Sequence, residues 1–257
     1  MNIKIVVATH KKYAFPADDI FLPVQAGSAI NSTLGYQRDD ENDNISSKNK
    51  HYCELSCLYW AWKNLSAEYY GLCHYRRYFA GNKSSNKFER IAGKDQLEHI
   101  LQRVPLILPQ PRKYFIESNF QQYVHAHHPE DLAVTRQVIS ELDADSLEAF
   151  DLVMQRKYGS RFNMFIMRKD LFNDYCFWLF RILFEVEKRL DISDYSAYDS
   201  RVFGFIGERL LDVYVVKNQL EYETMPLVNL EKQHWIKKIC NFLLRKFSGG
   251  KFGRQKK

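Results

Sequence analysis

Hydrophobic residues along this chain of 257 residues fall into two patterns, short unbroken runs and longer stripes with helical spacing. A short apolar or β-branched run that ends in polar or turn residues is typical of a buried strand in an α/β sheet. Five runs predict such strands, and they cover residues 3–10, 69–75, 104–109, 161–168 and 222–229. We expect the first of them to be a central strand of the sheet.

Apolar residues three and four positions apart predict helices between these strands. The predicted helices cover residues 51–64, 95–103, 130–141, 145–155, 171–190 and 194–216. The order of helices and strands indicates a mixed α/β fold. Residues 13–50 are rich in Pro, Gly, Asn, Asp and Ser, so we expect a long loop there instead of core.

Two predicted helices contain residues that are unfavourable at their positions. Glu54 lies in a helix that is apolar around most of its circumference, so its carboxylate needs a partner, either in an ion pair or in a ligand. Gly204 and Gly207 each cost roughly 1 kcal/mol relative to alanine inside a helix. We therefore expect another backbone or a ligand to approach closely at these glycines.

The net charge of +6 is distributed unevenly along the chain. Residues 231–257 hold nine Lys or Arg and one acid, whereas residues 1–230 hold 28 Lys or Arg and 30 Asp or Glu. We predict that residues 1–230 form the domain that carries the activity and that 231–257 form a basic tail, which meets an anionic surface. The nearly neutral domain has no electrostatic reason to bind nucleic acid.

The tail also contains apolar residues with helical spacing. A helix over residues 233–247 would align one apolar stripe, formed by Ile236, Ile239, Cys240, Leu243 and Phe247. This pattern predicts a basic amphipathic helix, too short to span a bilayer, that binds the inner face of the cytoplasmic membrane. A helix packed on the protein's own core is the alternative.

The chain shows no signs of export. Its first residues lack the charged start, apolar centre and cleavage site of a signal peptide. The five cysteines are odd in number and lack the spacing of metal ligands, which favours free thiols in a reducing compartment. We therefore expect a cytoplasmic protein that is peripheral on the membrane.

Polar and cationic residues stand at the ends of two predicted strands. They are Thr9, His10 and Lys11 at the first strand, and His74, Arg76 and Arg77 at the second. Ligands of open α/β sheets bind at the carboxyl ends of strands, and the arginine fork matches phosphate oxygens. The sequence therefore predicts a diphosphate site, against the alternative of a surface turn with solvated arginines.

Three histidines lie within four positions, at His125, His127 and His128. Such a cluster suggests a metal, but no Asp, Glu or Cys nearby completes a ligand set. A sugar-contacting or structural role is therefore favoured over metal binding.

Several separated motifs carry a family resemblance. They are VATHK at 7–11, DNIS at 43–46, YCEL at 52–55 with LYW at 58–60, GLCHYRRYF at 71–79, NMFIM at 163–167, and RVFGF at 201–205 with ERL at 208–210. In this order they resemble the bacterial capsule, exopolysaccharide and O-antigen glycosyltransferases once grouped only as a domain of unknown function. The resemblance runs from about residue 4 to residue 229.

The resemblance implies a GT-A-like, Rossmann-like sheet and an inverting β-galactofuranosyltransferase that uses UDP-galactofuranose. The Asp-x-Asp that would hold a divalent ion is missing, and His74, Tyr75 and Arg76 take its place. Fixed cations could then neutralise the leaving UDP instead of a metal. Asp43 and Asn44 of the acidic loop are included with the donor-binding residues. This loop leaves binding of Mn²⁺ or Mg²⁺ as an open alternative.

The resemblance also implies site residues for the transfer itself. An inverting reaction needs a base for the acceptor hydroxyl, and Glu208 is the candidate, with an ion pair to Arg201 or Arg209 as its alternative role. We expect His125, His128 and Asn163 to contact the acceptor or the sugar.

The competing function is a non-catalytic, membrane-associated scaffold of a polysaccharide-assembly complex. The basic tail supports it, whereas the polar residues gathered at strand ends favour an enzyme. The predicted partners of the enzyme are a nucleotide sugar, a saccharide acceptor that is lipid-linked in related systems, and an anionic membrane.

Overall fold

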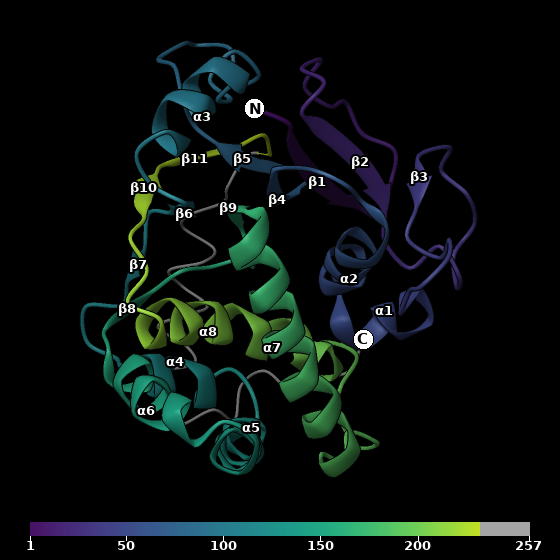
Figure 1. Ribbon diagram of the computed structural model, residues 1–257. Helices are drawn as coiled ribbons and strands as arrows, with labels where there is room; N and C mark the ends of the chain where they lie inside the picture. The colour runs from purple at the N-terminus through teal and green to yellow at the C-terminus, as the bar shows by residue number, and fades with distance from the viewer. Residues whose placement is uncertain (232–257) are drawn as a thin grey trace.

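The computed structural model describes residues 1–231, and a mixed sheet of nine strands forms its centre (Figure 1). The strands are β1 (Ile3–Thr9), β2 (Phe21–Gln25), β3 (Gln37–Arg38), β4 (Tyr69–His74), β5 (Arg77–Phe79), β6 (Leu106–Pro109), β9 (Phe165–Arg168), β10 (Glu223–Met225) and β11 (Leu227–Asn229). The main path runs β10-β6-β9-β4-β1-β2-β3. All of its strands are parallel except β9, which is antiparallel to both β4 and β6. Two further strands, β7 (Arg112–Lys113) and β8 (Tyr158–Gly159), pair separately.

Helices cover the sheet and form a second layer beside it. They are α1 (Asn49–Tyr52), α2 (Leu55–Asn64), α3 (Lys94–Leu101), α4 (Asn119–Val124), α5 (Pro129–Leu142), α6 (Leu147–Gln155), α7 (Lys169–Arg189) and α8 (Val202–Lys217). In Figure 1 the main sheet lies in the upper half, and α4, α5, α6 and α8 gather below it. The mixed α/β fold expected from the sequence is confirmed.

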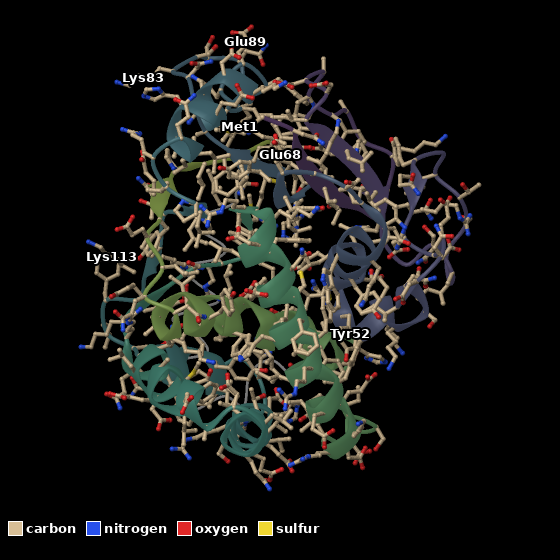
Figure 2. All side chains as sticks on the ribbon, viewed as in Figure 1. Met1, Tyr52, Glu68, Lys83, Glu89 and Lys113 are labelled. Atoms are coloured by element: carbon tan, nitrogen blue, oxygen red, sulfur yellow. The ribbon has the colours of Figure 1, made fainter. Side chains whose placement is uncertain are left out.

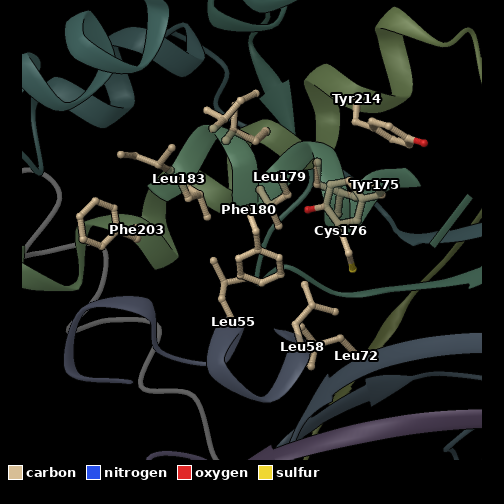
Figure 3. Packing of buried hydrophobic residues seen from close by; sticks show 14 of the residues in the cluster. Leu55, Leu58, Leu72, Tyr175, Cys176, Leu179, Phe180, Leu183, Phe203 and Tyr214 are labelled. Atoms are coloured by element: carbon tan, nitrogen blue, oxygen red, sulfur yellow. The ribbon is translucent and has the colours of Figure 1, made fainter. Parts of the chain in front are cut away.

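The hydrophobic core has two parts, one on each face of the sheet. Because side chains alternate along a strand, Ile5 and Val7 of β1 pack on the face covered by α3, whereas Val6 packs on the face covered by α2 and α7. Figure 3 shows the second part, in which Phe180 of α7 lies close to Leu55 of α2. Burial on both faces explains why the strands appear in the sequence as unbroken apolar runs.

The expectation that residues 13–50 form only a loop is wrong. β2 lies parallel to β1, and Val24 is fully buried. The proline at Pro23 disguised this strand, since proline cannot donate to a sheet ladder. It is tolerated because β3 pairs with β2 only at Val24 and Gln25, which leaves Pro23 at an open edge.

Two other predicted elements differ in detail, and one helix was not predicted. The helix expected over 51–64 is broken at Cys53, whose φ of 54° ends α1 before α2 begins. The last strand is divided at Pro226 into β10 and β11, which pair with different strands. The histidine-rich segment contains a helix, α4, that the sequence did not indicate. The predicted tail helix over 233–247 lies outside the described residues.

Candidate active site

A cavity of about 1600 Å³ opens at the carboxyl ends of β1 and β4. Thr9 and His10 line it from β1, and the segment from His74 to Arg77 lines it from β4 and the turn that follows. Residues from α1, α8 and the segment after β7 complete the wall. This is the sheet edge where ligands of open α/β folds bind, because loops diverge there and leave space.

The wall of the cavity is strongly cationic. Ten Lys or Arg residues and four Glu line it, although residues 1–231 together contain 28 Lys or Arg and 31 Asp or Glu. The ten are Lys50, Arg76, Arg77, Lys87, Arg90, Arg112, Lys113, Arg161, Arg201 and Arg209. A net charge of about +6 in the cavity of a slightly acidic body focuses the electrostatic field on an anion.

Two neighbouring arginines, Arg76 and Arg77, differ in their interaction partners. Arg76 donates from Nη1 to Glu231 at 2.9 Å. Arg77 lies over the ring of Phe162 at 4.1 Å, and no carboxylate among residues 1–231 pairs with it. Its Nε is buried without a hydrogen-bond partner in the same part of the chain, and burial, followed by the charge of Arg76, lowers the Arg77 pKa. Arg77 is therefore a guanidinium ready for an anionic ligand.

Unusual backbone conformations surround the floor of the cavity. Cys53, Phe162 and Asn163 all have positive φ, at 54°, 73° and 51°, a region that residues other than glycine rarely adopt. The break at Cys53 places Glu54 in the cavity wall, where its Oε1 accepts a hydrogen bond of 2.7 Å from Asn163 Nδ2. Backbone strain of this kind is typical of functional sites. It persists only where the surrounding fold holds the strained residues in place.

The backbone of Phe162 links two predicted site residues. Its carbonyl accepts a hydrogen bond of 2.7 Å from His74 Nε2, and its N–H donates to Glu208 Oε1 at 3.1 Å. His74 also lies 3.8 Å from Glu54. Burial lowers the pKa of His74, with the charge of Glu54 opposing, so the imidazole is held as a neutral donor through Nε2.

Glu208 stands in the wall of the cavity on α8. Its Oε2 accepts from Arg209 Nη1 at 2.9 Å and lies 3.5 Å from Arg161 Nη1. The ion pair with Arg209 that the sequence offered as an alternative is thus present, whereas Arg201 donates to Cys53 Sγ instead. A carboxylate has about four lone-pair sites, so one remains for a hydroxyl beside these three contacts.

A family model described as a domain of unknown function, DUF4422, matches residues 4–219. The chain belongs to the DUF4422 family. Comparison with curated proteins gives no match. The DUF4422 chain is similar to a solved structure of the WbbM bifunctional glycosyltransferase in its apo form, with a TM-score of 0.83 and 29% sequence identity over 90% of this chain. It spans 46% of the length of that chain.

The cavity of this DUF4422 chain gathers most of the predicted donor residues. Thr9, His10, His74, Arg76 and Arg77 line it. Lys11 is outside the lining, but it pairs with Glu231, a lining residue that also binds Arg76, and so lies near the rim.

Asp43 and Asn44 do not reach the cavity. Asp43 accepts a hydrogen bond from Tyr59, and Asn44 donates to the carbonyls of Asp40 and Asn42 within its own turn. The loop instead turns inward at Asp39, a buried carboxylate that accepts from backbone and serine donors. Asp43 and Asn44 thus make local contacts in this structure and lie outside the cavity lining.

The predicted acceptor residues also separate. His125 lines the cavity with its Nδ1 3.1 Å from Glu117, whereas His128 stacks on Tyr195 outside the lining. Asn163 lies beneath the lining, 1% exposed, and holds Glu54 from below. His127, which the sequence did not select, lines the cavity instead.

The residues at the diphosphate position do not fit a divalent cation. Mg²⁺ and Mn²⁺ prefer several carboxylate or carbonyl oxygens, whereas this position offers one imidazole, two guanidinium groups and the single carboxylate of Glu54. Residues 1–231 contain no group of three or more His, Cys, Asp or Glu side chains placed to hold a metal ion. No step of the proposed chemistry involves a metal.

Sequence reasoning missed the cations on the far wall. Arg112 and Arg161 line the cavity from the segments at β7 and before β9, and Arg161 lies over the ring of Tyr114 at 4.9 Å. The available signal was the basic residue at each end of the predicted strand, Arg161 and Arg168. Only the packing of β8 against β7 shows that both arginines face one space.

Proposed function

We propose that this chain is a glycosyltransferase of surface-polysaccharide biosynthesis. It transfers galactofuranose from UDP-galactofuranose to a saccharide acceptor with inversion at the anomeric carbon. The observation that carries the proposal is the cationic cavity at the carboxyl ends of β1 and β4, with the unpaired guanidinium of Arg77 in its wall. The similarity to the WbbM bifunctional glycosyltransferase supports the transferase activity, and the motif resemblance supports the donor.

The roles of the residues follow from their positions. Arg76 and Arg77 bind the diphosphate of the donor and neutralise the charge that develops as UDP leaves. His74 lines the same position as a neutral group, and its Nε2–H on the Phe162 carbonyl holds the turn beside Arg77. Thr9 and His10 lie on the neighbouring strand end and line the same cavity, where they are the proposed contacts of the nucleoside. Burial and the charges of Lys11 and Arg76 lower the pKa of His10, so this side chain is a neutral hydrogen-bonding group there.

Glu208 is the proposed general base. It accepts the proton of the acceptor hydroxyl while that oxygen forms a bond to the anomeric carbon, and the bond from this carbon to the UDP oxygen breaks on the opposite face. His125 also lines the cavity, with its Nδ1 3.1 Å from Glu117, and serves as an acceptor contact.

The basic tail is the proposed membrane contact of this chain. We propose that the chain acts at the inner face of the cytoplasmic membrane, where the basic residues of 231–257 meet anionic lipid. None of the helices within residues 1–231 combines the length and hydrophobicity of a bilayer span.

Thermal-shift measurements with UDP and nucleotide sugars test the donor site, because a ligand that binds the native state raises its apparent stability. Arg77→Ala should raise the Kd for UDP by roughly ten- to a hundredfold, the effect of losing a hydrogen bond to a charged group. The matched control is Arg181→Ala, an exposed arginine on α7 outside the cavity lining.

Equal UDP binding by the Arg77 variant and wild type would remove Arg77 from the donor site. Binding of UDP-galactofuranose without release of UDP in the presence of any saccharide acceptor would favour the non-catalytic scaffold.

A further inference from the structure

A short basic arm projects at the rim of the cavity. It consists of the paired strands β7 and β8 and the turn that follows β7, and Figure 2 shows Lys113 at the outer edge of the molecule. The same sequence, Arg-Lys-Tyr, begins with β7 at 112–114 and leads into β8 at 156–158. Residues 110–116 and 155–161 together contain five Lys or Arg and no Asp or Glu. The arm is therefore a local concentration of positive charge.

The tip of the arm exposes large apolar side chains. Phe115 is 83% exposed and Ile116 is 63% exposed, and Tyr158 and Phe120 beside them are exposed as well. Phe115 has a φ of 60° within a tight turn, in which the N–H of Ile116 donates to the carbonyl of Tyr114 at 2.7 Å. The turn therefore holds two apolar side chains outward, although burying them would stabilise the chain.

We propose that this arm docks the protein on an anionic lipid bilayer. Phe115 and Ile116 enter the boundary between headgroups and acyl chains, while Lys113 and Lys157 contact the lipid phosphates. The combination favours a membrane over a protein partner, because basic residues flank an apolar tip and tyrosines stand between them, as in interfacial anchors. Three carboxylates adjoin the arm, and each has a partner within the protein. Glu117 is buried and bonded to His125, Asp212 accepts a hydrogen bond from the Ser160 N–H, and Glu208 lies 3.5 Å from Arg161.

The arm lies at the mouth of the cavity, so docking through it would also position the cavity. The segment from Arg112 to Glu117 lines the cavity, so its tip and the cavity mouth share one rim. Docking through the tip would hold that mouth at the lipid surface, where a lipid-linked saccharide presents its end. This last step rests on the proposed function, whereas the docking itself does not.

Sedimentation of the full chain with vesicles tests the proposal without any sugar donor. Vesicles of phosphatidylcholine with about 30% phosphatidylglycerol should bind wild type more strongly than phosphatidylcholine alone. The double variant Phe115→Ser/Ile116→Ser should lower the partition coefficient on the anionic vesicles by about tenfold or more. The control, Ile30→Ser/Phe177→Ser, removes two other exposed apolar side chains, at 51% and 61% exposure, and should bind like wild type.

Two charge-reversal variants test the contribution of the lysines to vesicle binding. Lys113→Glu/Lys157→Glu should weaken binding to anionic vesicles and leave binding to neutral ones unchanged, whereas Lys83→Glu/Lys169→Glu, at exposed positions outside the arm, should have a smaller effect. Vesicle binding should persist in Arg77→Ala, which lacks the proposed diphosphate contact. This readout separates a failure of docking from a failure of the proposed donor site.

Direct insertion is measured with Phe115→Trp and brominated lipids. We expect additional tryptophan quenching over wild type at this position and none for Phe177→Trp. Vesicle binding by the double serine variant equal to wild type, or no added quenching at residue 115, would overturn the proposal. So would a wild-type dimer in sedimentation velocity that the double variant dissociates, since the tip would then bind a second copy.

Discussion

Two carboxylates, Glu54 and Glu208, stand on the cavity wall in different surroundings. Glu208 contacts two guanidinium groups and a backbone N–H, whereas Glu54 contacts Asn163 and lies near His74. No Lys or Arg within residues 1–231 forms an ion pair with Glu54. Both carboxylates line the cavity where an acceptor hydroxyl would lie, and Glu208 is the proposed base.

Substitution of each carboxylate by glutamine separates the two roles. Glu208→Gln keeps the side-chain shape and removes the base, so kcat should fall by roughly 10²-fold or more while UDP binding is retained. Glu54→Gln retains a carbonyl for Asn163 and should change kcat by less than about tenfold. Steady-state kinetics and UDP titration check both. The reverse pattern, with turnover lost only in Glu54→Gln, would assign the proton transfer to Glu54.

At the scale of elements, α8 is positioned by its two glycines. A Cβ at Gly207 would lie 2.9 Å from Leu55 Cδ1 and 3.0 Å from Asn163 Oδ1, and a Cβ at Gly204 would lie 3.3 Å from Cys53. The close approach expected from the sequence is therefore an approach of α8 to the broken helix α1–α2. This packing holds Asn163 under Glu54 and brings Glu208 to the cavity.

Gly207→Ala tests this packing. Alanine favours the helix by about 1 kcal/mol, but its methyl group would displace the fully buried Leu55 and Asn163, so we expect a net loss of about 1 to 2 kcal/mol in the free energy of unfolding and reduced turnover. Gly204→Ala has more room and should lose less. Urea unfolding of both variants measures the difference, and an equal or higher stability of Gly207→Ala would show that the contact is not tight.

At the scale of the whole molecule, the charge distribution matters more than the net charge. The described chain is slightly acidic, yet its cavity is strongly cationic. We expect the Kd for UDP to rise several-fold between about 50 mM and about 500 mM NaCl, because salt screens the field of the cavity. Isothermal titration with uridine, which lacks the phosphates, is the control and should show little dependence on salt. Equal salt dependence for both ligands would mean that the cavity charge does not bind the diphosphate.

The sequence by itself determined the α/β class and most of the elements, because buried strands and helices leave apolar runs and stripes whatever their neighbours are. It also placed His74, Arg76 and Arg77 at a strand end, since the end of an apolar run is a local property. β2 was missed because Pro23 interrupts its run, and only the open edge of the sheet explains why the strand survives.

Tertiary structure decided the composition of the site. Glu54, Asn163 and Glu208 are far apart in the sequence, so their sequence positions do not reveal that they lie close together in the fold. Their proximity depends on the strained turns at Cys53 and Phe162 and on the packing of α8 against α1 and α2. Asp43 shares a motif with the family yet lies outside the cavity, because Asp39, four residues earlier, turns the loop inward. A motif records which residues occur together in sequence, whereas long-range packing determines which of them face the same ligand.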